Sequence, residues 1–385
     1  MAGTRTPLAA LLPAFLPDDD LSLPLSVLAS LGITSDVDLL FAPSSLPPHP
    51  SLPPALFARL RSFAAAHLSA PSRSGSALLQ SLPTSAKGKG KQPDRYSSSL
   101  PPLDALLAGG FAPGELVELV GPRSSLRTSF VLHVVLLHLL EHADSRVAFV
   151  DSTASFDPYR CLAILRDGLV PRLRALGGGS FAGRGGATGE AGEPDDEKLA
   201  IEVLDRLSVS RTSRSGEAVD ALLAEVSRGD VRIAVVDSVD VLLGAGGALE
   251  KGAQGNANLV AFMRRLGTIA RSSSHPTTIF LINSAVPATP ALQPSPIQPP
   301  PLSSLPVPRP LVPSLGTAFP YLVDLSLLFT PASLVSGTTA TEKENETVLI
   351  EVRKNSRGPA GGLVGVRLVS QSKSAPLRVL PSPAL

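Results

Sequence analysis

Apolar positions follow two periods between about residue 100 and residue 370. Seven short runs are apolar at almost every position, and four longer segments repeat apolar residues at helical spacing. The predicted strands are 116–120, 147–151, 233–237, 278–283, 322–329, 348–352 and 364–369. The predicted helices are 128–142, 158–168, 217–228 and 256–272. Because strands that are apolar throughout need cover on both faces, this alternation predicts an α/β fold with a mostly parallel sheet.

The rest of the chain divides around that core. Short amphipathic segments, the strongest at 56–68, predict a small all-helical N-terminal domain over residues 1–75, with Ser35 as a helix cap. Residues 76–99 combine prolines with alternating lysine and glycine and predict a flexible linker, so that the core covers 100–385. Inserts at about 177–197 and 287–313 bury too little apolar surface to fold, and we expect disorder there.

Composition adds a few limits. The 385 residues are 43% hydrophobic, which supports a buried core, and the 38 prolines and 32 glycines agree with the inserts. The formal net charge of +1 leaves binding to nucleic acid open, since only a local basic surface would serve it. Cys161 is the single cysteine, which excludes an intrachain disulfide. The longest apolar run, 130–140, is about half of the roughly 20 residues that a membrane span needs, so no membrane association is expected.

The connection between the first predicted strand and the following helix is an altered phosphate-binding loop. Residues 121–129 read Gly-Pro-Arg-Ser-Ser-Leu-Arg-Thr-Ser. In the full motif, glycine is followed by four variable residues, glycine, lysine and then serine or threonine. Gly121 and Thr128 match, whereas Leu126 replaces the second glycine and Arg127 replaces the lysine. Such a loop directs backbone N–H groups and a helix dipole at phosphate, although a plain tight turn at Gly121 gives the same order of elements.

An acidic residue ends a later strand, as a magnesium site beside this loop requires. Asp237 closes the apolar run 231–236, and the carboxyl ends of strands are where open α/β sheets bind ligands. Thr128 and Asp237 are therefore the candidate Mg²⁺ ligands. The candidate ATP-binding residues are Gly121, Pro122, Arg123, Ser124, Ser125, Leu126, Arg127, Thr128, Ser129 and Asp237. Arginine keeps the charge of the missing lysine, but its planar fork is a poor substitute for a compact ammonium group.

Four stretches carry a family resemblance, namely 103–121, 147–160, 231–238 and 280–284. In them the chain resembles the eukaryotic RecA-like recombinases, and specifically their non-catalytic paralogues. The N-terminal segments 31–40 and 55–68 are similar to the small helical domain of the delta-type paralogue. The resemblance implies a RecA-like P-loop NTPase core preceded by that domain, with ATP and Mg²⁺ as cofactors.

Departures from the family pattern bear on activity. Thr153 falls where the resemblance places the general-base glutamate, and a threonine cannot take a proton from water at neutral pH. We therefore expect little or no enzymatic activity, and a DNA-dependent ATPase if any remains. The expected function is a nuclear accessory protein of homologous recombination. It would join other recombinase paralogues through its N-terminal domain and core, and contact DNA, chiefly single-stranded. The alternatives are an active strand-exchange ATPase and an unrelated, kinase-like P-loop protein.

Overall fold

A computed structural model describes most of the chain. The described residues are 7–11, 22–42, 49–68, 95–123, 125–175, 196–244, 253–272, 276–287, 311–316, 319–336, 347–368 and 377–379. The chain separates into two compact units, Met1–Lys91 and Gln92–Leu385.

The described elements of the first unit are helices, joined by turns and two isolated β-bridges. Its helices are α1 (Leu8–Leu11), α2 (Ser22–Ser30), α3 (Asp36–Phe41) and α4 (Pro54–Leu68). Ser35 caps α3 as predicted: its hydroxyl accepts a hydrogen bond from the backbone N–H of Asp38, and the Asp38 carboxylate accepts one from the Ser35 N–H. The buried side chains of Leu28, Leu39 and Leu60 contribute to a separate small core.

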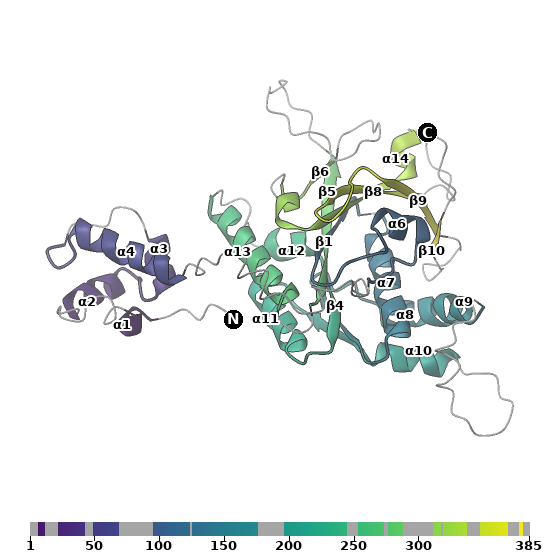
Figure 1. Ribbon diagram of the computed structural model, residues 1–385, viewed down its shortest axis with the longest axis horizontal. Helices are drawn as coiled ribbons and strands as arrows, with labels where there is room; N and C mark the ends of the chain where they lie inside the picture. Colours follow the sequence, from purple (N-terminus) through teal and green to yellow (C-terminus); the bar gives the residue numbers. More distant parts are fainter. Residues whose placement is uncertain are drawn as a thin grey trace, which may run out of the picture. The chain divides into compact units, whose positions relative to one another are not determined.

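The second unit is built on one large sheet (Figure 1). Its strands are β1 (Leu116–Gly121), β2 (Arg146–Asp151), β3 (Leu207–Arg211), β4 (Val231–Asp237), β5 (Thr278–Pro287), β6 (Leu311–Pro313), β7 (Leu325–Pro331), β8 (Thr347–Asn355), β9 (Leu363–Leu368) and β10 (Leu377–Val379). The order is β10-β9-β8-β7-β1-β5-β4-β2-β3, and β6 pairs with the end of β5. The strands from β7 to β3 in this order pair in parallel, while β7 to β10 form an antiparallel ladder. The α/β fold with a mostly parallel sheet is confirmed.

Helices cover both faces of the sheet (Figure 1). They are α6 (Pro101–Leu106), α7 (Arg127–Glu141), α8 (Pro158–Ile164), the π-helix η3 (Leu165–Leu169), α9 (Val170–Ala175), α10 (Asp196–Leu204), α11 (Ser215–Val226), α12 (Val239–Gly244), α13 (Ala253–Ala270), the 3-10 helix η4 (Phe319–Leu322) and α14 (Ala332–Ser336). One buried cluster contains apolar residues of α6 to α10, and another contains those of α11 to α13. Within the described ranges, no helix combines the length and the apolar character needed to cross a membrane.

Several elements differ from the predicted ones. Strands β3, β6 and β10 and helix α10 were not predicted, because they are short or lie beside the polar inserts. The end of the predicted linker belongs to the second unit: Tyr96 exchanges backbone hydrogen bonds of 2.9 and 2.8 Å with Phe111, and Ser98 is fully buried. The outer residues of both predicted inserts lie in α10, β5 and β6. Residues 176–195 and 288–310, on which the predicted disorder falls, lie outside the described residues.

A fully buried carboxyl group joins the three central strands. Glu118 of β1 accepts hydrogen bonds from Asn283 Nδ2 of β5 at 2.8 Å and from the Ser326 hydroxyl of β7 at 2.6 Å. Burial raises the pKa of Glu118, and the two hydrogen bonds oppose that shift. The side chain is therefore part of the core rather than of a surface.

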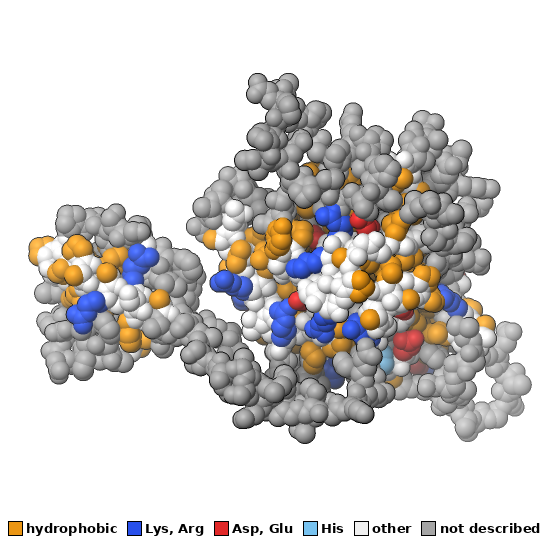
Figure 2. Space-filling view, turned by 45° about the horizontal axis from the view of Figure 1, so that its top comes forward, with side chains coloured by type: hydrophobic (Ala, Val, Ile, Leu, Met, Phe, Trp, Pro, Cys, Tyr) orange, Lys and Arg blue, Asp and Glu red, His pale blue; other side chains and the backbone are white. Residues whose placement is uncertain are grey.

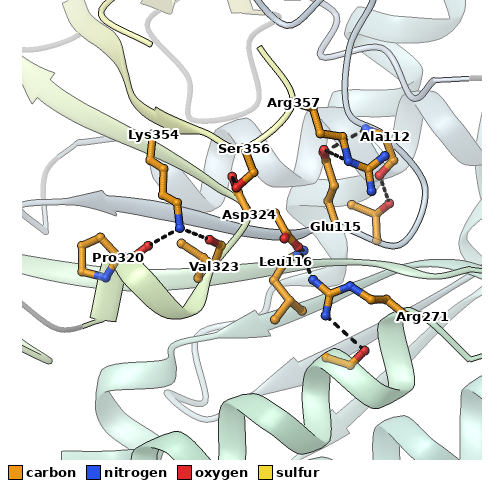
Figure 3. A network of polar contacts seen from close by, with 12 residues as sticks. Ala112, Glu115, Leu116, Arg271, Pro320, Val323, Asp324, Lys354, Ser356 and Arg357 are labelled. Carbon is orange, nitrogen blue, oxygen red and sulfur yellow. Dashed lines mark hydrogen bonds and ion pairs between the residues drawn. The ribbon is translucent and has the colours of Figure 1, made fainter. Parts of the chain in front are cut away.

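A polar network closes the edge of the sheet at which β1 begins (Figure 3). The Asp324 carboxylate accepts a hydrogen bond of 2.9 Å from the Leu116 N–H and one of 2.6 Å from Arg271 Nη2. Glu115 forms an ion pair of 3.1 Å with Arg357. These contacts hold the start of β1 between the start of β7 and the turn after β8, at the opposite edge from Gly121.

Candidate nucleotide site

The connection between β1 and α7 follows a backbone path suited to glycine at two positions of the motif. A Cβ atom on Gly121 would lie 2.5 Å from the Phe329 carbonyl oxygen of β7 and 2.6 Å from Ser125 Oγ, so only glycine fits there. Leu126, the N-cap residue of α7, has φ 59° and ψ 15°, in the left-handed region that glycine adopts freely and leucine does not. The backbone thus follows a path suited to glycine at both motif positions, although leucine occupies the second.

The Arg127 side chain is directed into the protein. Its side chain is 7% exposed, and each of its three guanidinium nitrogens donates to a protein oxygen. Nε bonds Ser125 Oγ at 3.0 Å, Nη2 bonds the Pro122 carbonyl at 3.1 Å, and Nη1 bonds the Asn283 carbonyl. Burial lowers the pKa of Arg127, while Asp240 and Asp237 oppose that shift.

The two candidate magnesium ligands lie side by side. The Thr128 hydroxyl donates a hydrogen bond of 2.8 Å to Asp237 Oδ2, although 109 residues separate them in the chain. Burial at the end of β4 raises the pKa of Asp237 to about 6, against the effect of the Thr128 hydrogen bond and of the Arg127 charge. A hydroxyl and a carboxylate at this distance fit the oxygen ligands that Mg²⁺ prefers.

The residues of the loop fit the phosphates of a nucleotide less well than Thr128 and Asp237 fit Mg²⁺. A phosphate-binding loop needs a free cation and converging N–H groups, whereas the charge of Arg127 is directed to the loop's own oxygens. Leu126 adds a side chain where close approach of the backbone to phosphate needs glycine. The two candidate Mg²⁺ ligands are therefore in contact, whereas the phosphate-binding part of the motif is altered.

The turn after β2 lacks a carboxylate that is free to act as a base. Thr153 is exposed, and its hydroxyl bonds Asp151 Oδ1 at 3.1 Å and Ser155 Oγ at 2.6 Å. The neighbouring carboxylate of Asp151 is 2% exposed, and it also accepts hydrogen bonds from the backbone N–H groups of Thr153, Ser155 and Phe156. Asp151 therefore organises the turn around Thr153.

The structure brings most of the predicted site residues together. Besides those already placed, the Ser129 hydroxyl lies below the loop and accepts a hydrogen bond from Arg160 Nη2, and Arg123 is exposed on the loop. Ser124 lies outside the described residues. Sequence reasoning missed Arg160 as a contact of the loop. Its signal was the Asp157-Pro158 helix start, which puts residue 160 in the first turn of α8 after β2.

Two histidines of α7, His133 and His138, and the single cysteine are also buried. The His138 ring lies 2.7 Å from the Ser145 hydroxyl through Nε2, and burial lowers its pKa to about 3. Burial also raises the pKa of the Cys161 thiol to about 12, so the thiol stays protonated and unreactive at neutral pH. In the part of the chain that the structure describes, no three His, Cys, Asp or Glu side chains are grouped as metal ligands.

With this geometry, the class of the second unit is an α/β protein with a P-loop-type strand–loop–helix beside an acidic strand end. No protein-family model matches the chain. It is 33% identical to the DNA repair and recombination protein RadB of Thermococcus kodakarensis over 132 residues, which are 33% of this chain and 57% of RadB. It is 30% identical to the protein RecA of Synechocystis sp. over 131 residues, 34% of this chain and 30% of RecA. A crystal structure of the RadB recombinase aligns with a TM-score of 0.47 and 19% identity, covering 74% of this chain and all of that one.

These similarities make the chain a distant homologue of the RecA and RadB recombinases, with a RecA-like core. The aligned segments span 57% of RadB and 30% of RecA, so the chain matches only part of each relative. The assignment to a eukaryotic paralogue of the delta type is finer than these similarities reach and stays a prediction.

Proposed function

We propose that this protein is an accessory subunit in homologous-recombination repair. Its RecA-like core would serve as a structural part of a recombinase-paralogue complex and would hydrolyse ATP weakly or not at all. The similarity to the DNA repair and recombination protein RadB supports a role in recombination repair. The altered nucleotide site supports the accessory role.

The observation that carries the proposal is the use of the acidic side chain in the turn after β2. Hydrolysis needs a group that takes a proton from the attacking water. Thr153 has no such group, and the Asp151 carboxylate accepts four hydrogen bonds from the turn that it organises. An arginine, Arg211, also lies 3.6 Å from Asp151. These contacts commit the carboxylate to the turn and to Arg211, so it is not free to position and deprotonate an attacking water.

The inward position of Arg127 supports the same conclusion from the other side of the site. In phosphoryl transfer, positive charge near the β- and γ-phosphates stabilises the transition state. Here the guanidinium donates to Ser125, Pro122 and Asn283. The retained Thr128–Asp237 pair favours a second candidate, a subunit that binds Mg²⁺-nucleotide without turnover.

ATP turnover by the full chain, with and without single-stranded DNA, tests the accessory role. We expect a rate at the level of an Asp237→Ala control, since the control removes one candidate metal ligand. Turnover well above that control would contradict the proposal and establish the DNA-dependent ATPase. A Mg²⁺-ATP-dependent rise in the melting temperature without turnover would select the second candidate, because a ligand stabilises the folded state to which it binds.

A restoration series sharpens this test. Leu126→Gly with Arg127→Lys restores the loop, and Thr153→Glu restores the carboxyl group that the resemblance places after β2. We expect nucleotide binding to appear with the first pair, and turnover only in the triple variant. Turnover by the loop pair alone would show that Thr153 is not the limiting change.

DNA and paralogue contacts belong to the same proposal. We propose that the N-terminal unit and the core both contact other recombinase paralogues, and that the full protein binds single-stranded DNA in the nucleus. Co-expression with candidate paralogues followed by size-exclusion chromatography tests the first point. Single-stranded DNA binding that weakens steeply with salt would support the second, because phosphate contacts release counterions. A fluorescent fusion that stays out of the nucleus would contradict the location.

A further inference from the structure

Arg127 joins two parts of the core that lie far apart in the sequence. Its Nε and Nη2 atoms bond the loop after β1, and its Nη1 atom bonds the carbonyl of Asn283 in β5, 156 residues away. Asn283 lies where β5 leaves the main sheet: β1 pairs with β5 as far as Ser284, and from Ala285 onward β5 pairs with β6. The arginine therefore holds the base of the β5–β6 hairpin.

Other contacts at the same point show that this base is a packed junction. Ser314, just after β6, donates its hydroxyl to Asn283 Oδ1 at 3.0 Å and its N–H to the Ser284 carbonyl at 2.8 Å. The hairpin side chains Ala285 and Leu311 are buried in one small cluster with Val120 of β1 and Leu328 of β7. Movement of Asn283 would thus move both strands of the hairpin.

We propose that Arg127 is a structural tie, by which we mean that its hydrogen bonds to protein oxygens hold the loop after β1 to the base of the β5–β6 hairpin. The side chain occupies the first turn of α7, where the helix dipole disfavours a cation, and it is 7% exposed. Such a placement is stable because three oxygens on the loop and on β5 receive the N–H groups. A lysine carries one ammonium group and does not reproduce this planar, three-way contact.

The tie has a consequence for the chain between Pro287 and Leu311. Those two residues face each other across the hairpin, so the segment begins and ends on a base that Arg127 fixes. The two residues from which that segment leaves the core are therefore held in place by contacts within the protein. This inference deepens the proposed function, on which it rests for the meaning of the altered loop, but it concerns structure rather than turnover.

Hydrogen exchange of the full chain tests the tie, with Arg127→Met as the main variant and Arg206→Met as the matched control. Arg206 follows α10 in the chain and lies at the C-terminal end of α7. There it donates to the carbonyls of Leu139, His142 and Ser145. We expect Arg127→Met to raise the exchange rate of amides in 283–287 and 311–314 about tenfold. Exchange follows local opening, and loss of the arginine contacts should make the opened state about ten times more populated. Arg127→Lys should give an intermediate rise.

The control variant should raise exchange around residues 139–147 and leave the hairpin at its wild-type rate. Millimolar Mg²⁺-ATP should leave the hairpin of the wild type unchanged. Wild-type exchange of the hairpin in Arg127→Met, or an equal rise in both variants, would overturn the tie. ATP turnover by the wild type would overturn the proposed function but not the tie, which is judged in samples without nucleotide.

Discussion

An arginine lies at each end of helix α7, and the helix dipole has the opposite effect on the two. Arg127 is the first residue of the helix, whereas Arg206 comes from a later part of the chain. At the C-terminal end, Arg206 donates hydrogen bonds of 2.5, 2.7 and 3.2 Å to the carbonyls of Leu139, His142 and Ser145. A cation there is favoured by the helix dipole, typically by about 0.3–1 kcal/mol. At the N-terminal end, Arg127 also donates to three oxygens, but the dipole opposes its charge.

The difference shows that the Arg206 contact is favourable in every respect, whereas the Arg127 contact is explained by the position of that residue in the loop motif. Arg206 has both geometry and electrostatics in its favour. Arg127 occupies the motif position of a phosphate-binding lysine, and Asp237 and Asp240 offset part of its unfavourable setting. The N-terminal end therefore keeps the charge of a ligand-binding loop while using it for an internal contact.

Replacing Arg206, the arginine at the C-terminal end of α7, should have the largest effect on stability. Arg206→Met keeps much of the aliphatic stem but removes the guanidinium donor from three carbonyl groups, of which that of His142 also accepts from the Ser145 N–H at 3.3 Å. We expect the free energy of unfolding to fall by about 3 kcal/mol, measured by urea denaturation at pH 7. The exposed arginine Arg172 on α9 provides the control, since Arg172→Met should change stability by less than about 0.5 kcal/mol. Equal values for the two variants would remove Arg206 from the comparison.

The buried histidine near the same end should make the protein acid-sensitive. The pKa of His138 is about 3 in the fold and 6.5 ordinarily, so below pH 6.5 the unfolded chain takes up a proton that the folded one does not. The stabilising contribution is full above about pH 6.5 and decreases as the pH falls toward 3, by about 2.5 kcal/mol at pH 4.5. His138→Gln should remove this part of the pH dependence in urea titrations at pH 7 and 4.5. A constant difference between wild type and variant over that interval would contradict it.

The acidic residue near the N-terminal end should act in the opposite direction. The pKa of Asp237 is raised from 3.8 to about 6, so between these values the folded chain holds a proton that the unfolded chain has lost. Stability should therefore fall as the pH rises from about 4 to about 6, by about 2 kcal/mol. Asp237→Asn can still accept the hydrogen bond from Thr128, and it should abolish this fall in the same pH series. A wild-type curve parallel to that of the variant would show that Asp237 is ordinary.

The smallest effect is expected at Arg127. Arg127→Met loses three hydrogen bonds, but it also removes a buried charge from the unfavourable end of a helix dipole. We expect a loss of only about 1 kcal/mol in the free energy of unfolding at pH 7. A loss as large as that of Arg206→Met would mean that both ends of α7 are held equally, and the comparison would fail.

The sequence predicted the sheet because its central strands are apolar on both faces. The seven predicted strands and the four long helical patterns are all present, and the apolar stretch before Gly121 forms β1. Edge strand β3 was missed because Leu207–Arg211 alternates with polar residues and has a single buried position. Helix α10 was missed because its start, Asp196, lies in the acidic end of a predicted insert.

The candidate site was predictable in membership and not in geometry. The motif and the acidic strand end predicted Thr128 and Asp237 as a pair. They are in contact because the strand order brings the carboxyl ends of β1 and β4 close together. The sequence could not indicate that Arg127 turns inward, since its acceptors are backbone carbonyls that carry no residue-specific signal. For the same reason, the hydrogen bonds that occupy Asp151 became visible only with the turn 151–156 in place.

Glu118 has a consequence for how the chain reaches this fold. Its carboxyl group finds partners only if β5 lies on one side of β1 and β7 on the other, because Asn283 and Ser326 supply the two donors. A slip of β1 by one residue would turn that carboxyl group to the opposite face of the sheet. A buried carboxyl group without donors costs several kcal/mol, whereas the neighbouring valines and leucines of β1 would accept many apolar partners. One polar side chain thus encodes the neighbours and the alignment of the central strand, which its apolar residues leave ambiguous.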